Sequence, residues 1–382
     1  MVKHNTPDQI AFFNALAVGN IERMLASVAN VPGVLDSFDY RNFGATPLTA
    51  ACFSNRPAIV EAVIEMGADP NRKSDWSMGP WSPLHCALFR RDNRMAEYLL
   101  SHGATMDVHT AAGLGRYSEV ARLLDDDPSR VVERGGDGCH PLHFADTADV
   151  AQLLLERGAE MDGRCIDHYS TPVQYLCSTR PEVARFLLSK GASPDIFSAV
   201  LCGSMDTLDK LMNANPGLIH ARINQSFFPP GNEHDVYNIL NFSIGVDATP
   251  LHAAAKSDRR ESVCMLADRG LMPDIRGGYD QATPLHTAAW SNCPVSAEAL
   301  LDVGADINAR SGKIHNNSPA GWAVVAGSDK VFDLLINRGA ECYEWFLDDA
   351  RDALNGRFDQ VSNASPDQRA RIFSRLEQLN AI

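Results

Sequence analysis

Histidine is the residue type that could carry chemistry most directly in this chain, because its side chain titrates near neutral pH and ligates metals. The sequence holds twelve histidines. Four of them occupy the same place in a short recurring word, and we expect each to bond the backbone of a neighbouring loop: His85, His143, His252 and His286. The histidines left for chemistry are His109, His140, His168, His220, His234 and His315.

Acid–base catalysis would need one of these histidines beside a carboxylate or a second polar group. Asp167 precedes His168 and Glu233 precedes His234, although adjacent residues on an extended loop point apart. No nucleophile elbow, phosphate-binding glycine loop or His-Glu-x-x-His motif occurs. The sequence therefore favours a protein without catalytic residues. If it is an enzyme, the candidates are His168, His234 and Tyr237.

The nine cysteines could bind metal, but their spacing argues against it. Cys139 lies near His140 and His143, and Cys165 lies near His168, yet neither group supplies three ligands at zinc spacing. The cysteines stand singly, without a Cys-x-x-Cys pair, as free core thiols do in a reducing compartment. We expect no metal and no cofactor.

Charge and hydropathy restrict the partners. The chain has 48 acidic and 34 basic residues and a net charge of -14, which disfavours nucleic acid. Its N-terminus lacks the apolar core of a signal peptide, and no run of about 18 apolar residues predicts a membrane span. We expect a cytoplasmic, monomeric protein that binds neither nucleic acid nor membrane.

A word of the form Thr/Ser-Pro-Leu-His-x-Ala organises the whole chain. Strong and weak copies begin at Thr46, Ser82, His140, Thr171, Thr249, Thr283 and Ser318. A second word, Gly-Ala-x-x-Asx or a variant, begins at Gly67, Gly103, Gly158, Gly191, Gly270, Gly304 and Gly339. The interval from the Pro of the first word to the Gly of the second is 20 residues in five copies. It is 17 and 19 residues in the other two.

Each word has a physical reason. The Thr or Ser caps a helix, and Pro fits the first turn, where its missing N–H costs nothing. Leu and Ala pack inward, a second amphipathic helix follows, and Gly ends that helix in a left-handed cap. Three further units keep the helical text without the Thr-Pro word, from Asp8, Asp107 and Asp195. About ten repeats result.

This pattern resembles the ankyrin repeat, whose period is about 33 residues. The stretch from Ile166, IDHYSTPVQYL, is similar to a group of long bacterial ankyrin-repeat proteins that implies no settled activity. The resemblance implies an all-α solenoid of about ten helix-turn-helix repeats with loop fingers, a finger being the loop before the first helix of a repeat. We expect an N-terminal capping repeat over 1–45, repeats over 46–219 and 249–341, and a helical cap over 342–382.

One insertion interrupts the array at 220–248. Pro216 and Pro250 lie 34 residues apart, where the equivalent Pro128 and Pro141 lie 13 apart. Its text is rich in aromatic residues, which argues against simple disorder. Two interpretations stay open, a binding loop and a packed brace across a widened junction.

The predicted binding residues lie in unusual fingers, at the ends of first helices and in the insertion. Aromatic and histidine side chains replace plain turn residues in several fingers, and such side chains suit recognition. In ankyrin stacks the positions just after the first word face the groove, which here adds Phe53, Phe89, Arg90, Trp290 and Ser291. The full set is Phe43, Phe53, Trp76, Trp81, Phe89, Arg90, His168, Tyr169, Phe227, Phe228, His234, Tyr237, Tyr279, Trp290 and His315.

Two functions fit this set. The first is an interaction module that binds a protein or peptide partner in its concave groove. The alternative is a small-molecule-binding protein or enzyme with a pocket formed by the central repeats and the 220–248 insertion. An insertion folded back over the groove would form a pocket, whereas a projecting one would leave an open surface.

Overall fold

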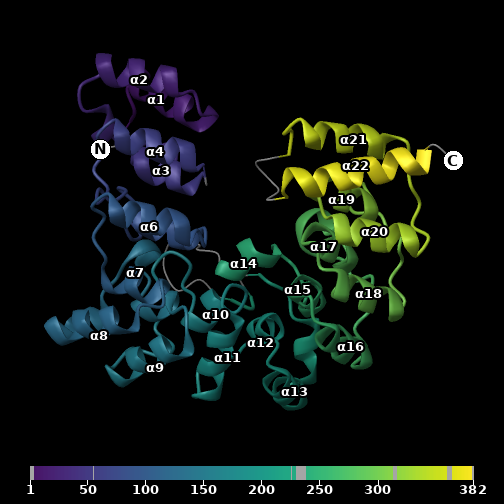
Figure 1. Cartoon of the computed structure of the whole chain (residues 1–382). Coiled ribbons are helices and arrows are strands. Elements are labelled where there is room, and N and C mark those ends of the chain that lie inside the picture. Colours follow the sequence, from purple (N-terminus) through teal and green to yellow (C-terminus); the bar gives the residue numbers. More distant parts are fainter. Residues whose placement is uncertain are drawn as a thin grey trace. The chain divides into compact units, whose positions relative to one another are not determined.

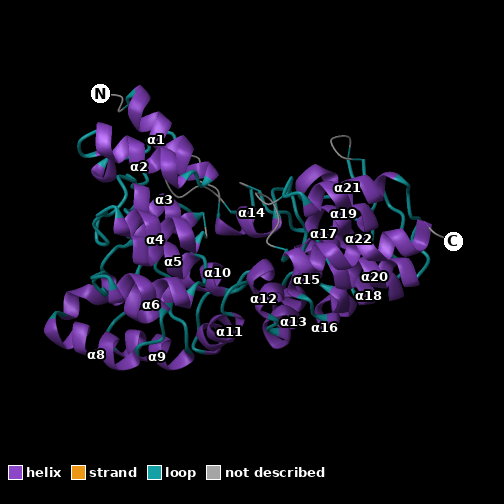
Figure 2. Cartoon of the chain, turned by 45° about the horizontal axis from the view of Figure 1, so that its top comes forward, coloured by secondary structure: helices purple, strands orange, loops and turns teal. Residues whose placement is uncertain are grey.

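The computed structural model consists of helices joined by loops (Figure 2). It describes residues 4–54, 56–224, 226–228, 238–312, 316–358 and 364–380. Those residues contain helices and two isolated β-bridges but no strand. The prediction of an all-α fold is confirmed.

The chain divides into two compact units, residues 1–172 and 173–382. The division at residues 172 and 173 was not predicted from the sequence. The helices of the first unit are α1 (Pro7–Val18), α2 (Ile21–Asn30), α3 (Pro47–Phe53), α4 (Pro57–Glu65), α5 (Pro83–Phe89), α6 (Asn93–Ser101), α7 (Val108–Gly113), α8 (Tyr117–Asp126) and α9 (Ala148–Glu156). Its 3-10 helices are η1 (Val34–Asp36), η2 (Pro128–Val132), η3 (Gly136–Gly138) and η4 (Pro141–Phe144).

The second unit continues the same architecture. Its helices are α10 (Pro172–Leu176), which starts at the boundary, α11 (Pro181–Ser189), α12 (Ile196–Cys202), α13 (Met205–Ala214), α14 (Ile239–Ile244), α15 (Pro250–Ser257), α16 (Arg260–Asp268), α17 (Pro284–Trp290), α18 (Pro294–Asp302), α19 (Pro319–Ala326), α20 (Asp329–Asn337), α21 (Trp345–Leu354) and α22 (Pro366–Asn380). Its 3-10 helices are η5 (Pro216–His220) and η6 (Tyr279–Gln281).

Ten antiparallel pairs follow one another along the chain, and within each unit they stack in sequence order (Figure 1). The pairs are α1–α2, α3–α4, α5–α6, α7–α8, η4–α9, α10–α11, α12–α13, α15–α16, α17–α18 and α19–α20. Helices α21 and α22 pack on each other and on the last pair. The prediction of about ten repeats is confirmed.

The recurring word forms the first helix of a repeat as its chemistry predicts. At Thr46 the side chain accepts the backbone N–H of Thr49, and Pro47 opens α3. The residues of α3 and α5 are buried except Phe53 and Phe89 at their last positions and the partly buried Ala50, because these helices are packed between neighbouring repeats. The second helix of each pair keeps one exposed face. A first helix can therefore offer side chains to a partner only near its ends.

Two repeats have no finger. Helix α6 ends at Ser101 and α7 begins at Val108, whereas α4 and α5 are separated by the residues from Met66 to Ser82. Helix α12 likewise follows α11 after a short turn. We call α7–α8 and α12–α13 the first and second fingerless repeats.

In the first unit the fingers on either side of the fingerless repeat meet directly. The backbone N–H of Asp137 donates to the carbonyl of Gly79 at 3.2 Å. A Cβ at Gly79 would lie 2.1 Å from the backbone nitrogen of Gly138, and Gly79 has a φ of 139°. Only glycine permits this approach.

Candidate functional site

Three of the four repeat-word histidines are structural clasps, as predicted. Their Nε2 atoms contact the carbonyl of the next finger, at 3.0 Å for His143 to Ser170, 3.1 Å for His252 to Ala282 and 2.9 Å for His286 to Asn317. Each Nδ1 accepts a backbone N–H of its own repeat. Burial lowers the pKa to about 3 for His143 and to about 4 for His252 and His286. These rings are neutral and fully used.

The same prediction is wrong for His85. Neither of its ring nitrogens makes a hydrogen bond, although the side chain is buried. Its Nε2 lies 3.4 Å from a carboxylate oxygen of Asp107 instead of a loop carbonyl. The cause is the missing finger of the next repeat, which would have supplied that carbonyl.

An aromatic cluster lies at the ends of two successive first helices in the first unit. Phe53 ends α3 and Phe89 ends α5, with ring centroids 5.7 Å apart. Trp81 lies within 5.7 Å of both rings. Phe89 is 45% exposed and Phe53 is half-buried, and Arg90 is exposed beside them. We call Phe53, Phe89 and Arg90 the first aromatic surface.

Trp81 packs against the rings of Phe53 and Phe89 from the interior of the protein. It is only 5% exposed, and its indole N–H donates to Asp137 at 2.7 Å. A buried indole with a satisfied N–H is a packing residue. Trp81 therefore offers no open face to a partner, in contrast to the role predicted for it.

Two fingers of the first unit carry a second aromatic pair, of which one ring is exposed and the other half-buried. Phe43 and Trp76 make an edge-to-face contact at 4.9 Å, and the fingers are joined by a hydrogen bond from Asp75 N to Gly44 O at 2.8 Å. Phe43 is 67% exposed and has a φ of 52°. A large side chain in the left-handed region is strained by roughly 1 kcal/mol or more.

In the second unit Trp290 and Tyr279 surround a tryptophan that the sequence analysis did not select. Trp322 is 8% exposed and lies 5.7 Å from Trp290 and 6.3 Å from Tyr279. Trp290 is 38% exposed and Tyr279 is 61% exposed. We call Tyr279 and Trp290 the second aromatic surface. A signal for Trp322 was present, since it stands four residues after Ser318, where the stronger copies have a smaller residue.

The central candidates of the first unit are held in a loop network. The Nε2 atom of His168 lies 3.6 Å from Asp137 and 3.7 Å from Asp167. The Arg164 guanidinium lies 4.8 Å from the Tyr169 ring and donates to the Tyr169 carbonyl at 2.7 Å. These contacts order the finger, and they leave Tyr169 36% exposed.

The described part of the insertion packs against its own repeat. Phe227 and Phe228 lie 5.2 and 6.0 Å from the fully buried ring of Phe197. At the base of the insertion the Ile223 N–H donates to the Ala248 carbonyl at 2.9 Å. His234 and Tyr237 lie outside the described residues, as does His315. Phe242, which was not predicted, is 69% exposed on α14.

Cys139 and His143, which are close in the sequence, lie beside Cys165 in the fold, and hydrogen bonds within the protein already use their polar atoms. Cys139, Cys165 and His143 bring their polar atoms within 4.8 Å of one another. A hydrogen bond from Cys139 lowers the pKa of Cys165, and the Ser170 N–H points to its sulfur at 3.3 Å. Both nitrogens of His143 are already bonded to backbone. The imidazole of His143 therefore has no lone pair for a metal.

No helix among the described residues is both long enough and apolar enough to cross a bilayer.

Comparison with known proteins agrees with this architecture. The family model for ankyrin repeats (3 copies) matches residues 12–110 and 196–311, more than half of the chain. The chain is 25% identical over 326 residues to the human transient receptor potential cation channel subfamily A member 1, covering 78% of this chain and 28% of the channel. It is 47% identical over 123 residues to ANK repeat-containing protein nipk-1 of Caenorhabditis elegans, covering 31% of this chain and 18% of that protein.

Other similarities are more distant. E3 ubiquitin-protein ligase KEG of Arabidopsis thaliana is 23% identical over 273 residues, covering 62% of this chain and 17% of the ligase. The crystal structure of the human ASB11 ankyrin repeat domain matches with a TM-score of 0.39 and 24% identity, covering 63% of this chain and all of that one. The chain spans less than a third of the length of each of the three curated relatives.

Ankyrin repeats are in general modules for protein interaction. Recurring capped helices, histidine clasps to the next finger and a family model over more than half of its length together establish that this chain belongs to the ankyrin-repeat family.

Proposed function

We propose that this protein is an interaction module that binds a protein or peptide partner in its concave groove, and that each aromatic surface is a binding site within its own unit. One observation carries the proposal. Phe53, Phe89 and Trp290 each stand seven residues after the first residue of a repeat word, and all three are at least partly exposed at the end of a first helix. Exposed aromatic residues of this kind supply most of the binding energy in protein interfaces.

The charge beside Phe89 narrows the partner chemistry. Arg90 and Arg94 are exposed next to it, in a chain whose net charge is -14. A partner segment with a large apolar side chain and a nearby carboxylate would fill both requirements, because Arg binds carboxylates with two parallel hydrogen bonds. We propose an extended or helical peptide segment of this composition, bound by a monomeric, cytoplasmic protein.

The test uses the full chain and a displayed library of random peptides. Peptides selected on the parent are measured against Phe89→Ser and Phe53→Ser, with Leu25→Ser as the control. Leu25 is 52% exposed on α2, outside either aromatic surface. We expect Phe89→Ser to weaken binding by about 10-fold or more, the effect of losing an anchor worth about 1.4 kcal/mol. Arg90→Glu should remove the preference for acidic peptides.

Unchanged affinity of the selected peptides for both Phe variants would contradict the proposal, and so would a library that yields no binder. Equal weakening by Leu25→Ser would also count against it, because the effect would then be one of general stability.

The alternative of a small-molecule pocket receives no comparable support. His168 and Tyr169 belong to the first unit, Phe227 and Phe228 to the second, and the two phenylalanines pack on Phe197. The bracing interpretation of the insertion is the one that these contacts favour.

A further inference from the structure

The first fingerless repeat leaves its preceding histidine without the usual clasp. His85 belongs to α5 and would bond a finger carbonyl of the next repeat, as His252 bonds Ala282. That finger does not exist before α7, where Asp107 caps the helix by accepting the Thr110 N–H at 2.9 Å. The connection between these two successive repeats therefore lacks the bond that His143, His252 and His286 make in theirs.

Three potential metal ligands gather at this gap. His85, Asp107 and His109 place one ligand atom each within 4.8 Å of one another. His85 and His109 are 0% and 1% exposed. The Nδ1 atoms of His85 and His109 have no hydrogen-bond partner, and the Nε2 atom of His85 has only its 3.4 Å contact with Asp107. Buried polar atoms without a partner cost about 1–3 kcal/mol each, so they call for a ligand.

The tautomer of His109 suits metal binding. The Nε2 of His109 contacts the Glu133 carbonyl at 3.0 Å, which fixes the proton on that nitrogen and leaves a lone pair on Nδ1. His109 therefore presents Nδ1 as a free ligand atom on α7, the helix that Asp107 caps.

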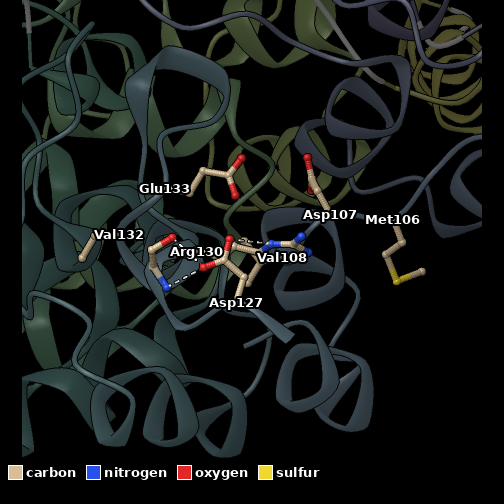
Figure 3. A pocket seen from close by; sticks show the side chains of 8 residues that line it. Met106, Asp107, Val108, Asp127, Arg130, Val132 and Glu133 are labelled. Carbon is tan, nitrogen blue, oxygen red and sulfur yellow. Dashed lines mark hydrogen bonds and ion pairs between the residues drawn. The ribbon is translucent and has the colours of Figure 1, made fainter. Parts of the chain in front are cut away.

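A hollow of about 580 Å³ opens next to the cluster. It is lined by Met106, Asp107, Val108, Asp127, Ser129, Arg130, Val132 and Glu133 (Figure 3). Arg130 is paired with Asp127 at 3.6 Å, which leaves Asp107 and Glu133 as the carboxylates of the hollow without a basic partner inside it. The local charge is thus negative and favours a cation.

We propose that His85, Asp107 and His109 form a binding site for one zinc ion, whose fourth position faces this hollow. Two imidazoles and one carboxylate are a known zinc ligand set, with bonds of about 2.0–2.2 Å. Ligand atoms of a tetrahedral site with those bonds lie about 3.4 Å apart. His85 Nε2 and Asp107 Oδ1 already have that separation, 3.4 Å.

The zinc ion would replace the missing clasp. It would connect α5, which carries His85, to α7, which carries Asp107 and His109. Zinc binding therefore stabilises the junction between two successive repeats, because the folded site binds the ion and the unfolded chain does not.

The chain contains its own matched control. In the second fingerless repeat the same three positions hold Gln174, Asp195 and Phe197. There the Gln174 side chain donates to Asp195 at 3.2 Å, and Ser198 also bonds that carboxylate. Replacing His85→Gln and His109→Phe in the first repeat copies this arrangement and removes both imidazole ligands.

The experiment titrates the metal-free full chain with Zn²⁺ by calorimetry, and with Co²⁺ by visible absorption, all in a Cys342→Ser background because Cys342 is exposed. We expect one strong site with a cobalt spectrum typical of nitrogen and oxygen ligands. The double variant His85→Gln/His109→Phe should bind at least about 100-fold more weakly. Asp107→Asn, which keeps the helix cap, should weaken binding by about 10-fold or more.

The control is His252→Gln, whose histidine is buried and fully bonded, and it should bind zinc like the parent. No strong site in the parent would overturn the proposal. A site with thiolate-to-cobalt absorption would also overturn it, as would a site that survives both the double variant and Asp107→Asn. If the double variant does not fold, Asp107→Asn alone decides.

Discussion

The two fingerless repeats meet the same loss in different ways. In the second, every polar group of the shared position is bonded: Gln174 donates to Asp195, and Asn238 donates to Gln174 at 3.1 Å. Phe227 and Phe228 of the insertion cover Phe197. In the first, two imidazoles keep nitrogens without partners, and a hollow remains beside them.

The difference shows what an insertion can do in a repeat array. The second repeat uses added chain to fill the space that a finger would occupy. The first uses no added chain, and its neighbouring fingers meet across the gap through Gly79, Trp81 and Asp137. We therefore interpret the added chain as a brace of the second fingerless repeat, whereas the fingers that meet beside the first leave room for a ligand.

The largest effect should come from removing the bridge. Trp81→Ala deletes a buried indole that contacts Phe53, Phe89 and Phe144 and leaves Asp137 without its donor. We expect the free energy of unfolding of the first unit, which contains Trp81, to fall by about 3–5 kcal/mol. Chemical denaturation of the full chain measures it. Trp76→Ala, at a half-buried ring, should cost much less, and equal losses would contradict the packing role of Trp81.

The next effect should come from removing the brace. Phe227→Ala with Phe228→Ala uncovers Phe197, and since both rings are half-buried we expect a loss of about 2–4 kcal/mol. Phe242→Ala is the control, because Phe242 is on the same insertion but 69% exposed. If the double variant unfolds at the same denaturant concentration as the parent, the insertion is no brace, and the binding interpretation gains.

A smaller effect concerns how stability depends on pH. A buried histidine that bonds the next finger contributes to this dependence, whereas the glutamine of the second fingerless repeat does not titrate. Burial lowers the pKa of His286 to about 4 in the folded protein, below the ordinary value of 6.5. Between these two pH values the unfolded chain therefore binds a proton that the folded chain does not. Stability is therefore complete above pH 6.5 and falls as the pH drops toward 4, by up to about 1.4 kcal/mol per pH unit.

His286→Gln introduces the side chain that stands at the equivalent place in Gln174. It should reduce the slope of stability against pH between 6.5 and 4 without abolishing folding. Unfolding midpoints at several pH values provide the measurement. A slope identical to that of the parent would show that His286 does not titrate in this range.

The sequence predicted the array and failed where segments distant in sequence meet. Caps such as Thr46 and the glycines after second helices are local signals, so the helix pairs follow from the text. The clasp of His85 failed because its acceptor belongs to a finger that is absent. Trp81 stands in an unusual finger and was expected to be exposed, but its burial depends on Gly136, whose missing side chain makes room for the indole. The hollow beside Asp107 depends on how η2 packs, which no local pattern encodes.

Some predictions remain open. The domain boundaries and the binding residues as a set stay predictions. His234, Tyr237 and His315 lie outside the described residues. The prediction of no metal was made from spacing alone and did not consider the set of His85, Asp107 and His109, because a residue of α5 meets residues at the start of α7 only in the fold.

Amide hydrogen exchange of the full chain with and without one equivalent of Zn²⁺ tests most directly the claim that the two fingerless repeats differ in this way. We expect slower exchange in α5 and α7 when zinc is present, because the ion joins these helices, and unchanged exchange in α10 and α12, where Gln174 and Phe197 replace the imidazoles. Unchanged exchange in α5 and α7, or an equal slowing in α12, would contradict it.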